Sequence, residues 1–159
     1  MNLRILSLIA ILSVLVTGAR AGTADVTNLD KVQVLMEKTQ VVALLGQPDG
    51  QDDLDAGLRM DVYRIEAAPL IGAGFIYDEK QRVAGQAYIF KGRGASGAAD
   101  HLKKIGFTLL ESEQGLFRLE GKDDDTGLPL VVTISESEDM TTLMAFEKTF
   151  YRAHPLRRP

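Results

Sequence analysis

The sequence predicts an α+β fold in which a short helix pair packs on an antiparallel sheet, followed by a second unit of one helix and several strands. Two observations lead to this class. Three β-rich segments, Leu58–Glu66, Leu70–Tyr77 and Val83–Lys91, follow one another with turn residues between them. Ahead of them the run 32–48 has helical spacing of its apolar residues and a strong helix stop.

The helix pair is predicted from two groups of apolar residues. Val32, Leu35 and Met36 stand at positions i, i+3 and i+4, and the run 41–45 repeats this spacing with one Val and two Leu. Gly46 then tolerates the left-handed backbone that closes a helix, and the proline at position 48 cannot continue one. We expect two short helices, or one kinked helix, that cover the strands that follow.

The same run resembles the SmpA/OmlA (BamE-like) group of small outer-membrane-assembly proteins. Met36, Val41 and the closing Leu45-Gly46-Gln47-Pro48 fall on the family's helical signature, while Leu35 and Glu37 depart from it. The resemblance covers Leu29 to about Phe90 and implies a helix pair on a three-stranded sheet, with a role in envelope assembly. The fold of the β-lactamase-inhibitor proteins is similar to the same arrangement and implies an inhibitor or ligand-binding protein instead.

Residues 1–21 have the composition of a cleavable signal peptide. Arg4 precedes an apolar core over Ile5–Val16, and Ala19-Arg20-Ala21 supplies small residues at the two positions that a signal peptidase reads. The apolar core is shorter than the roughly 20 residues that span a bilayer. We therefore expect a periplasmic or secreted protein with domains at 22–94 and 95–159.

Composition restricts the partners of the exported chain. The sequence contains no cysteine, so it has no residue for a direct lipid anchor, a disulfide or thiol catalysis. Without Arg4 and Arg20 the 18 basic residues become 16 against 22 acidic ones, a net charge of about -6. Because the charge is spread out and acidic, neither nucleic acid nor an anionic membrane surface is an expected partner.

The acidic run after the helix pair is predicted to be a solvated loop. Asp49–Gly57 carries four aspartates, which raises the question of a calcium loop. Counted from Asp49, however, Leu54 stands where such a loop needs glycine and Met60 where it needs glutamate. No metal site is therefore predicted.

The candidate binding residues come from the register of the second and third strands. If Asp78–Arg82 is the loop and Tyr77 faces Val83, one sheet face carries Gly72, Gly74, Tyr88 and Phe90. Glycine inside a strand often marks a close approach by another group, so these four residues are predicted either to bind a partner or to have Tyr88 folded over Gly72. We expect the helix Ala98–Ile105 of the second half to cover this face.

The second half is predicted to repeat the order of helix and then strands. After a small-residue linker, 92–97, the helix Ala98–Ile105 ends at Gly106. Strands are expected at Phe107–Glu111, Leu116–Gly121 and Leu130–Ser135, with a turn over Lys122–Gly127. Met140–Tyr151 carries both helical and strand signals, and we expect it to form a strand.

No motif in the chain indicates an enzyme or a cofactor. His101 and His154 lack partners at ligand spacing, and no serine stands in a nucleophile setting. The sequence therefore predicts an exported, non-enzymatic protein-interaction module whose partner is another envelope protein. The alternative is a secreted or periplasmic inhibitor or ligand-binding protein, which would capture one soluble protein or ligand.

The leader prediction has a direct test. Expressed in a Gram-negative host, the mature chain is expected to begin at Gly22 and to fractionate with the periplasm or medium. Intact-mass measurement of the fractionated protein checks this. A membrane-bound chain that keeps residues 1–21 would contradict it.

Overall fold

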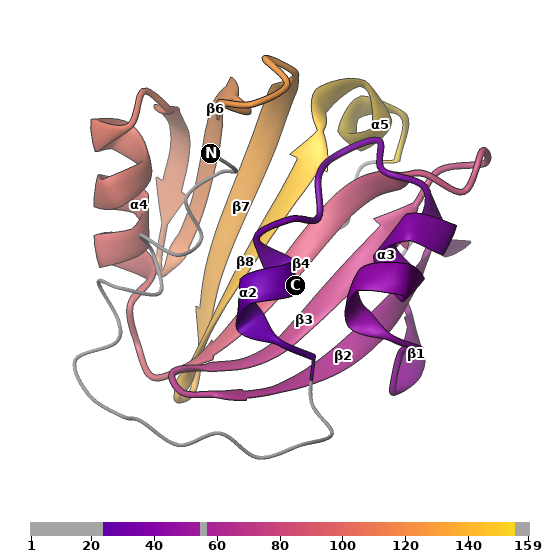
Figure 1. Ribbon diagram of the computed structural model, residues 1–159. Helices are drawn as coiled ribbons and strands as arrows, with labels where there is room; N and C mark the ends of the chain where they lie inside the picture. The colour runs from indigo at the N-terminus through magenta and orange to yellow at the C-terminus, as the bar shows by residue number, and fades with distance from the viewer. Residues whose placement is uncertain (1–23, 55–56, 155–159) are drawn as a thin grey trace.

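A computed structural model describes residues 24–54 and 57–154, and the predicted signal peptide lies outside the described residues. Eight strands form one antiparallel sheet in the order β1-β2-β3-β4-β8-β7-β6-β5 (Figure 1). The strands are β1 Gly50–Asp53, β2 Arg59–Ala67, β3 Leu70–Tyr77, β4 Val83–Lys91, β5 Thr108–Glu113, β6 Leu116–Lys122, β7 Pro129–Ser137 and β8 Met140–Glu147.

Short helices cover both faces of the sheet unequally. The helices are α2 Val26–Leu29, α3 Lys38–Leu45, α4 Ala95–Lys104 and α5 Lys148–Ala153. Helices α2 and α3 lie over the first four strands and α4 lies over the last four, on the same face (Figure 1). We call this the helix face, and the opposite one the back face. On the back face Phe150 and Tyr151 of α5 pack around Met60, Ile76 and Phe146.

The predicted fold class is therefore wrong. The structure is mostly β, one eight-stranded sheet with short helices, rather than a helix pair on a sheet followed by a second α+β unit. The physical reason is the pairing of β4 with β8, seven residue pairs from Gly85↔Phe146 to Lys91↔Met140. This ladder joins the first strands to the last ones, so neither half has a sheet of its own. The boundary between 22–94 and 95–159 stays a prediction.

The first predicted helix is not formed. Leu35 has a left-handed φ of 69°, and its N–H donates to the carbonyl of Val83 over 2.8 Å. The N–H of Val83 in turn donates to Met36, and Glu37 bridges Arg82. The segment runs beside the start of β4 because this extended path buries its valines on the sheet; Val32, for example, is 2% exposed.

The second predicted helix is confirmed. It begins after Glu37, whose side chain accepts from the backbone of Gln40 while the Gln40 side chain accepts from the N–H of Glu37. This reciprocal pair satisfies two donors that a helix start leaves open. The helix ends at Gly46, which has a φ of 84°, and the Gly46 N–H donates to the carbonyl of Val42 over 2.9 Å.

Other local predictions are confirmed with small shifts of their ends. The strands predicted at 70–77 and 83–91 have those bounds, and the predicted 98–105 helix begins three residues earlier. The region 140–151 was predicted to be a strand. It forms strand β8 as far as Glu147 and then begins helix α5, so the prediction is correct only for the first part. The predicted acidic loop is wrong at Gly50–Asp53, which forms edge strand β1 against β2.

The connection from β4 to α4 is held by residues of β7 and β8. Glu136 accepts from the Ala95 N–H at 3.1 Å and from the Arg93 guanidinium at 2.6 Å. Thr141 accepts from the Gly94 N–H at 2.9 Å and donates to the Gly92 carbonyl at 2.8 Å. The Arg93 guanidinium and the Ala95 amide lower the pKa of Glu136, so the charged carboxylate is the form held at the start of α4.

The cap at Gly46 gives a prediction about stability. Gly46→Val should lower the free energy of unfolding by more than about 1 kcal/mol, because a β-branched residue tolerates a φ of 84° poorly. Gly50→Val is the matched control: a side chain at Gly50 also meets open space, but this glycine lies in strand β1 and has no left-handed φ. Thermal and urea melts measure the stability of both variants. Equal stabilities would contradict the idea that Gly46 is required for its left-handed φ.

Candidate functional site

The four binding residues predicted from sequence do not form one surface. The predicted register holds at Tyr77↔Val83, but an irregularity shifts the ladder by one residue, so that Gly74 pairs with Ala87 and Ala73 with Tyr88. Paired residues share a face, so Gly72 and Gly74 lie on the back face. Tyr88 and Phe90 belong to the core under the helices and are fully buried.

Tyr88 therefore has a structural role rather than a place in an open site. Its hydroxyl donates to Gln86 Oε1 at 3.0 Å, and Gln86 Nε2 donates to the carbonyl of Val32 at 3.1 Å. Burial raises the pKa of the Tyr88 hydroxyl, which keeps it protonated. This chain of hydrogen bonds fastens the extended segment before α3 to the sheet.

The groups predicted to pack over Gly72 and Gly74, which were Tyr88 and the helix Ala98–Ile105, do not do so. Gly74 is covered by Met60, whose Sδ would lie only 2.4 Å from an added Cβ, and not by Tyr88. Gly72 has room by comparison, with Ile89 and a backbone oxygen 3.7 Å from the same position. Helix α4 packs on the helix face, with Leu102 in the main core, so it does not reach the back face.

A buried polar cluster fixes α3 to the sheet. Asp61 on β2 is 2% exposed. Its carboxylate forms an ion pair with Lys38 Nζ and accepts a hydrogen bond from Gln51 Nε2, both at 2.7 Å. Lys38 also lies over the ring of Tyr77, 4.9 Å from its centroid. Burial, followed by the charge of Asp61, raises the pKa of Tyr63 to about 12. Because its carboxylate is already paired, we read this cluster as structural.

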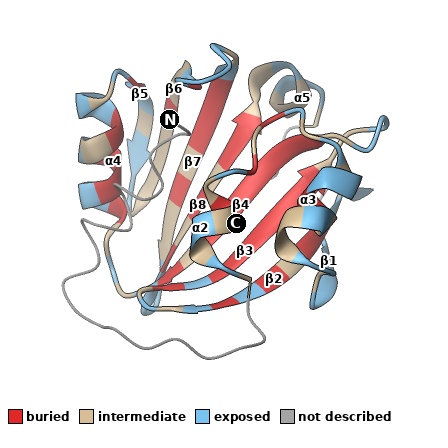
Figure 2. Ribbon diagram, viewed as in Figure 1, coloured by how far each residue is buried: buried red, intermediate tan, exposed pale blue. Residues whose placement is uncertain are grey.

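The exposed ends of the sheet differ from each other. The two edge strands are β1 and β5, and both are largely exposed, whereas the central strands are buried (Figure 2). Strand β1 has four residues and carries Asp52 and Asp53, charges of the kind that protect an edge from further pairing. Strand β5 has six residues, and its Leu109 and Leu110 are 37% and 48% exposed. An edge of this length that exposes two leucines is a place where another strand can add.

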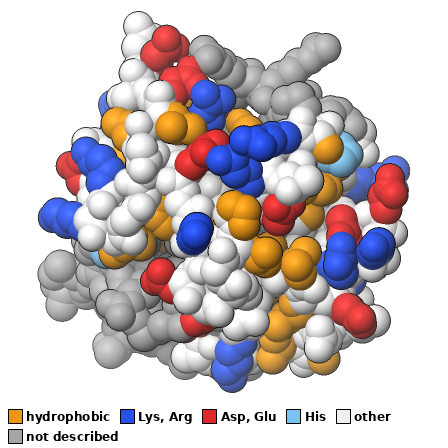
Figure 3. All heavy atoms as spheres, turned by 90° about the horizontal axis from the view of Figure 1, so that it is seen from above, with side chains coloured by type: hydrophobic (Ala, Val, Ile, Leu, Met, Phe, Trp, Pro, Cys, Tyr) orange, Lys and Arg blue, Asp and Glu red, His pale blue; other side chains and the backbone are white. Residues whose placement is uncertain are grey.

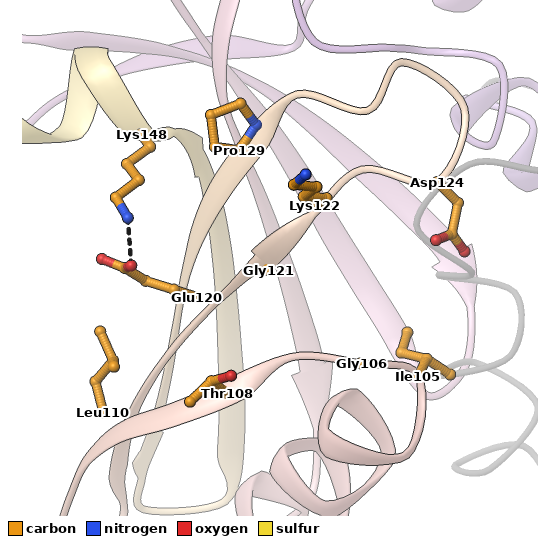
Figure 4. A pocket seen from close by; sticks show the side chains of 10 residues that line it. All are labelled: Ile105, Gly106, Thr108, Leu110, Glu120, Gly121, Lys122, Asp124, Pro129 and Lys148. Carbon is orange, nitrogen blue, oxygen red and sulfur yellow. Dashed lines mark hydrogen bonds and ion pairs between the residues drawn. The ribbon is translucent and has the colours of Figure 1, made fainter.

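An open hollow of about 570 Å³ lies beside β5, and we call it the pocket. Figure 4 shows it between the start of β5, strand β6 and the first residue of α5. Its lining residues are Ile105, Gly106, Thr108, Leu110, Glu120, Gly121, Lys122, Asp124, Pro129 and Lys148. Thr108 and Leu110 belong to the edge strand itself, so the pocket and the open edge form one continuous site, which we call the β5 site.

Local sequence explains how the pocket is built. Gly106 ends the α4 turn with a φ of 101°, which lets the chain reverse directly into β5. Gly121 has no side chain because the ring of Phe107 occupies that place, 2.5 Å from an added Cβ. Asp123 holds the β6–β7 turn by accepting from the N–H groups of Asp125 and Thr126.

Charges of both signs line the pocket. Lys148 forms an ion pair with Glu120 at one side of it (Figure 4). Lys148 is the first residue of α5, whose start is fixed by Glu147 accepting from the N–H groups of Thr149 and Phe150. Basic and acidic side chains are likewise interspersed over the surface seen in Figure 3. The site is therefore suited to an amphipathic polypeptide segment better than to one strongly charged ligand.

None of the β5 site residues was predicted as a binding residue from the sequence. The strand itself was predicted, but whether a strand lies at an edge depends on which strands pair, which short-range patterns do not contain. The consecutive leucines 109 and 110 were the one available signal, because a regular strand buries only one of two neighbours.

Within 24–54 and 57–154 no group of three or more metal-ligating side chains occurs. Over the same residues no helix is long and apolar enough to cross a membrane.

Comparison with known proteins shows no family. No family model matches the chain, and no curated protein does. A crystal structure of an extracellular protein containing an SCP domain, from Bacillus anthracis str. Ames, is similar over 89% of this chain with 14% sequence identity and a TM-score of 0.44. The chain spans about half of that protein, 52%. Similarity at this level carries no inference about activity.

The SmpA/OmlA (BamE-like) resemblance is accordingly corrected. The structure has an eight-stranded sheet, and its first expected helix is an extended segment. Neither this family nor the β-lactamase-inhibitor arrangement describes the observed fold. What the matched residues share with that family is a local helix stop, which many folds use.

The back-face glycines give a prediction. Gly74→Ala should destabilise by about 1–3 kcal/mol, because the new methyl group and Met60 cannot occupy the same place. Gly72→Ala is the matched control and should be neutral or slightly stabilising, since an added Cβ there meets only ordinary contacts.

Denaturant melts compare these two variants. Met60→Ala in the Gly74→Ala background should recover part of the loss, since it removes the clashing atoms. Equal effects at the two glycines would show that Met60 does not cover Gly74.

Proposed function

We propose that this protein is an exported, non-enzymatic protein-interaction module that binds an extended polypeptide segment along β5. The observation that carries this proposal is that β5, an edge strand of the described sheet, exposes two leucines and also lines a pocket. In binding by strand addition, main-chain hydrogen bonds to the edge supply affinity. Pockets that take alternate side chains of the added strand supply specificity.

Export is part of this proposal, and the leader sequence supports it. A charged start, a short apolar core and Ala19-Arg20-Ala21 are the features of a cleavable signal peptide. An exported chain without cysteine depends on its packed core for stability. The core of 23 buried residues on the helix face is a sufficient source of it.

The site suits a polypeptide partner because of its shape and composition. An added strand would lie beside Leu109 and Leu110 and cover apolar surface that is now in contact with water. Its side chains on the back-face side would enter the pocket near Thr108, within reach of the paired Lys148 and Glu120. Ion pairs that are only partly exposed contribute to selection of a partner more than to affinity.

The test is site-specific photo-crosslinking in the host envelope. A benzophenone amino acid at Leu110 should give protein adducts, because this side chain points to the bound segment. The same amino acid at Ile71, which is 38% exposed on the distant β3, is the matched control and should give few. Adducts that are equal at both positions, or absent at Leu110, would contradict binding at the β5 site.

A further inference from the structure

We propose that the segment bound at β5 belongs to a folded protein, which also packs on the back face of β6, β7 and β8 and places an acidic group on Arg118. This inference rests on the proposed function, since it extends the surface that the same partner uses. Six half-buried residues form this surface, which we call the back-face platform: Leu116, Arg118, Thr133, Ser135, Thr142 and Met144.

The sheet register places the platform in two rows that cross three strands. The paired residues of the two rows are Met144, Thr133 and Arg118 in the first, and Thr142, Ser135 and Leu116 in the second. Paired residues share a face, and Met144 packs against the cluster around Phe146 on the back face. The six side chains of the platform therefore point to the back face together.

The platform is continuous with the β5 site. Thr108 of β5 pairs with Glu120 of β6, and both residues line the pocket. Glu120 stands two residues from Arg118 on the same strand, so the two side chains are neighbours on one face. A partner that enters the pocket from the β5 edge therefore meets the platform next.

The two faces of these strands differ in how well they are covered. On the helix face Leu119, Val132 and Leu143 are at most 2% exposed, whereas every residue of the platform is only partly buried. Arg118 is the one charged residue of the platform, and the others are apolar or carry a hydroxyl group. A surface that is poor in charge but contains Met and Arg has the composition of the centre of a protein interface.

The size of the β5 edge indicates that the partner is a folded protein. The six residues of β5 extend over about 20 Å, and an added strand is about 5 Å wide, so it covers on the order of 100 Å² in projection. A stable interface covers about 800 Å² on each partner. Strand β8, which carries Met144, lies three strand spacings or about 14 Å from β5, beyond the reach of a single added strand. A short extended peptide cannot cover both surfaces, whereas a folded protein can.

Arg118 determines the chemistry of the partner. Its side chain is 40% exposed, and its Nη2 lies 3.4 Å from Glu111 Oε2, a longer contact than a close charge-assisted hydrogen bond. Its Nε is buried and has no hydrogen-bond partner among the residues that the structure describes. Because Glu111 uses only part of the guanidinium, a carboxylate of the partner can bind its exposed side.

The first experiment compares crosslinks of the full chain in the host envelope. A benzophenone amino acid at Thr142 should give an adduct with the same protein as at Leu110, identified by the masses of its peptides. Ile71 is again the control and should give few adducts. If Leu110 gives an adduct and Thr142 gives none, or one with a different protein, this inference is overturned and the proposed function stands. If Leu110 gives no adduct, the proposed function is contradicted and this inference falls with it.

The second experiment tests the acidic group. Thr133→Glu places a carboxylate opposite Arg118 within the same chain. The yield of the Leu110 adduct should then fall at least about fivefold, because the new carboxylate pairs with Arg118 and repels the acidic group of the partner. Thr133→Gln, which has a similar size and no charge, is the matched control and should keep most of the yield. Unchanged thermal melts show that both variants fold, and equal yields in the two would overturn the role of Arg118.

Discussion

The architecture depends on the pairing of β4 with β8. All other ladders of the sheet join strands that follow one another in the chain and so form hairpins, whereas β4–β8 joins strands separated by α4 and three further strands. Loop-closure entropy must be overcome before such a distant contact forms, so it needs support from its surroundings. That support comes from Glu136 and Thr141, which hold the residues between β4 and α4 against the sheet.

The central ladder decides where the hydrophobic core lies. Because it aligns the two sets of strands, α2, α3 and α4 all cover one face, and their apolar residues join a single cluster from Leu29 to Ala145. Of the described helices, α5 packs on the back face, where side chains also lie over glycines, Met60 at Gly74 and Phe146 at Gly85. This is why the glycine positions, which suggested a binding surface, are instead places of close packing.

The same topology places β1 and β5 at the two edges of the described sheet, and these strands differ in length and composition. Strand β1 is short and acidic, features that discourage further pairing. Strand β5 is longer, exposes two leucines and borders a pocket that Gly106 and the β6–β7 turn help to shape. A bulge at Leu110 interrupts the ladder, where β5 passes from pairing at Leu109 to pairing at Glu111, and both leucines are exposed. The proposed function follows from this one asymmetry.

The sequence by itself determined the elements whose causes are local. The strands at 70–77 and 83–91, the Asp123 turn and the stop at Gly46 follow from side-chain alternation, turn chemistry and a left-handed glycine, all of which act within a few residues. The helical spacing of apolar residues over Val32–Met36 led to a wrong prediction of a helix. Pairing and burial beside β4 outweighed the weak helical preference of this segment.

Only the tertiary structure decided the fold class, the faces of the sheet and the candidate site. The one-residue irregularity between Ile76 and Tyr77 moved Tyr88 from the glycine face into the core, and a shift of one residue reverses the face of each side chain that follows. The β4–β8 ladder, and with it the identity of β5 as an edge, depends on contacts between distant residues. Such contacts leave no periodic signal in the sequence, since any of the predicted strands could in principle have paired there.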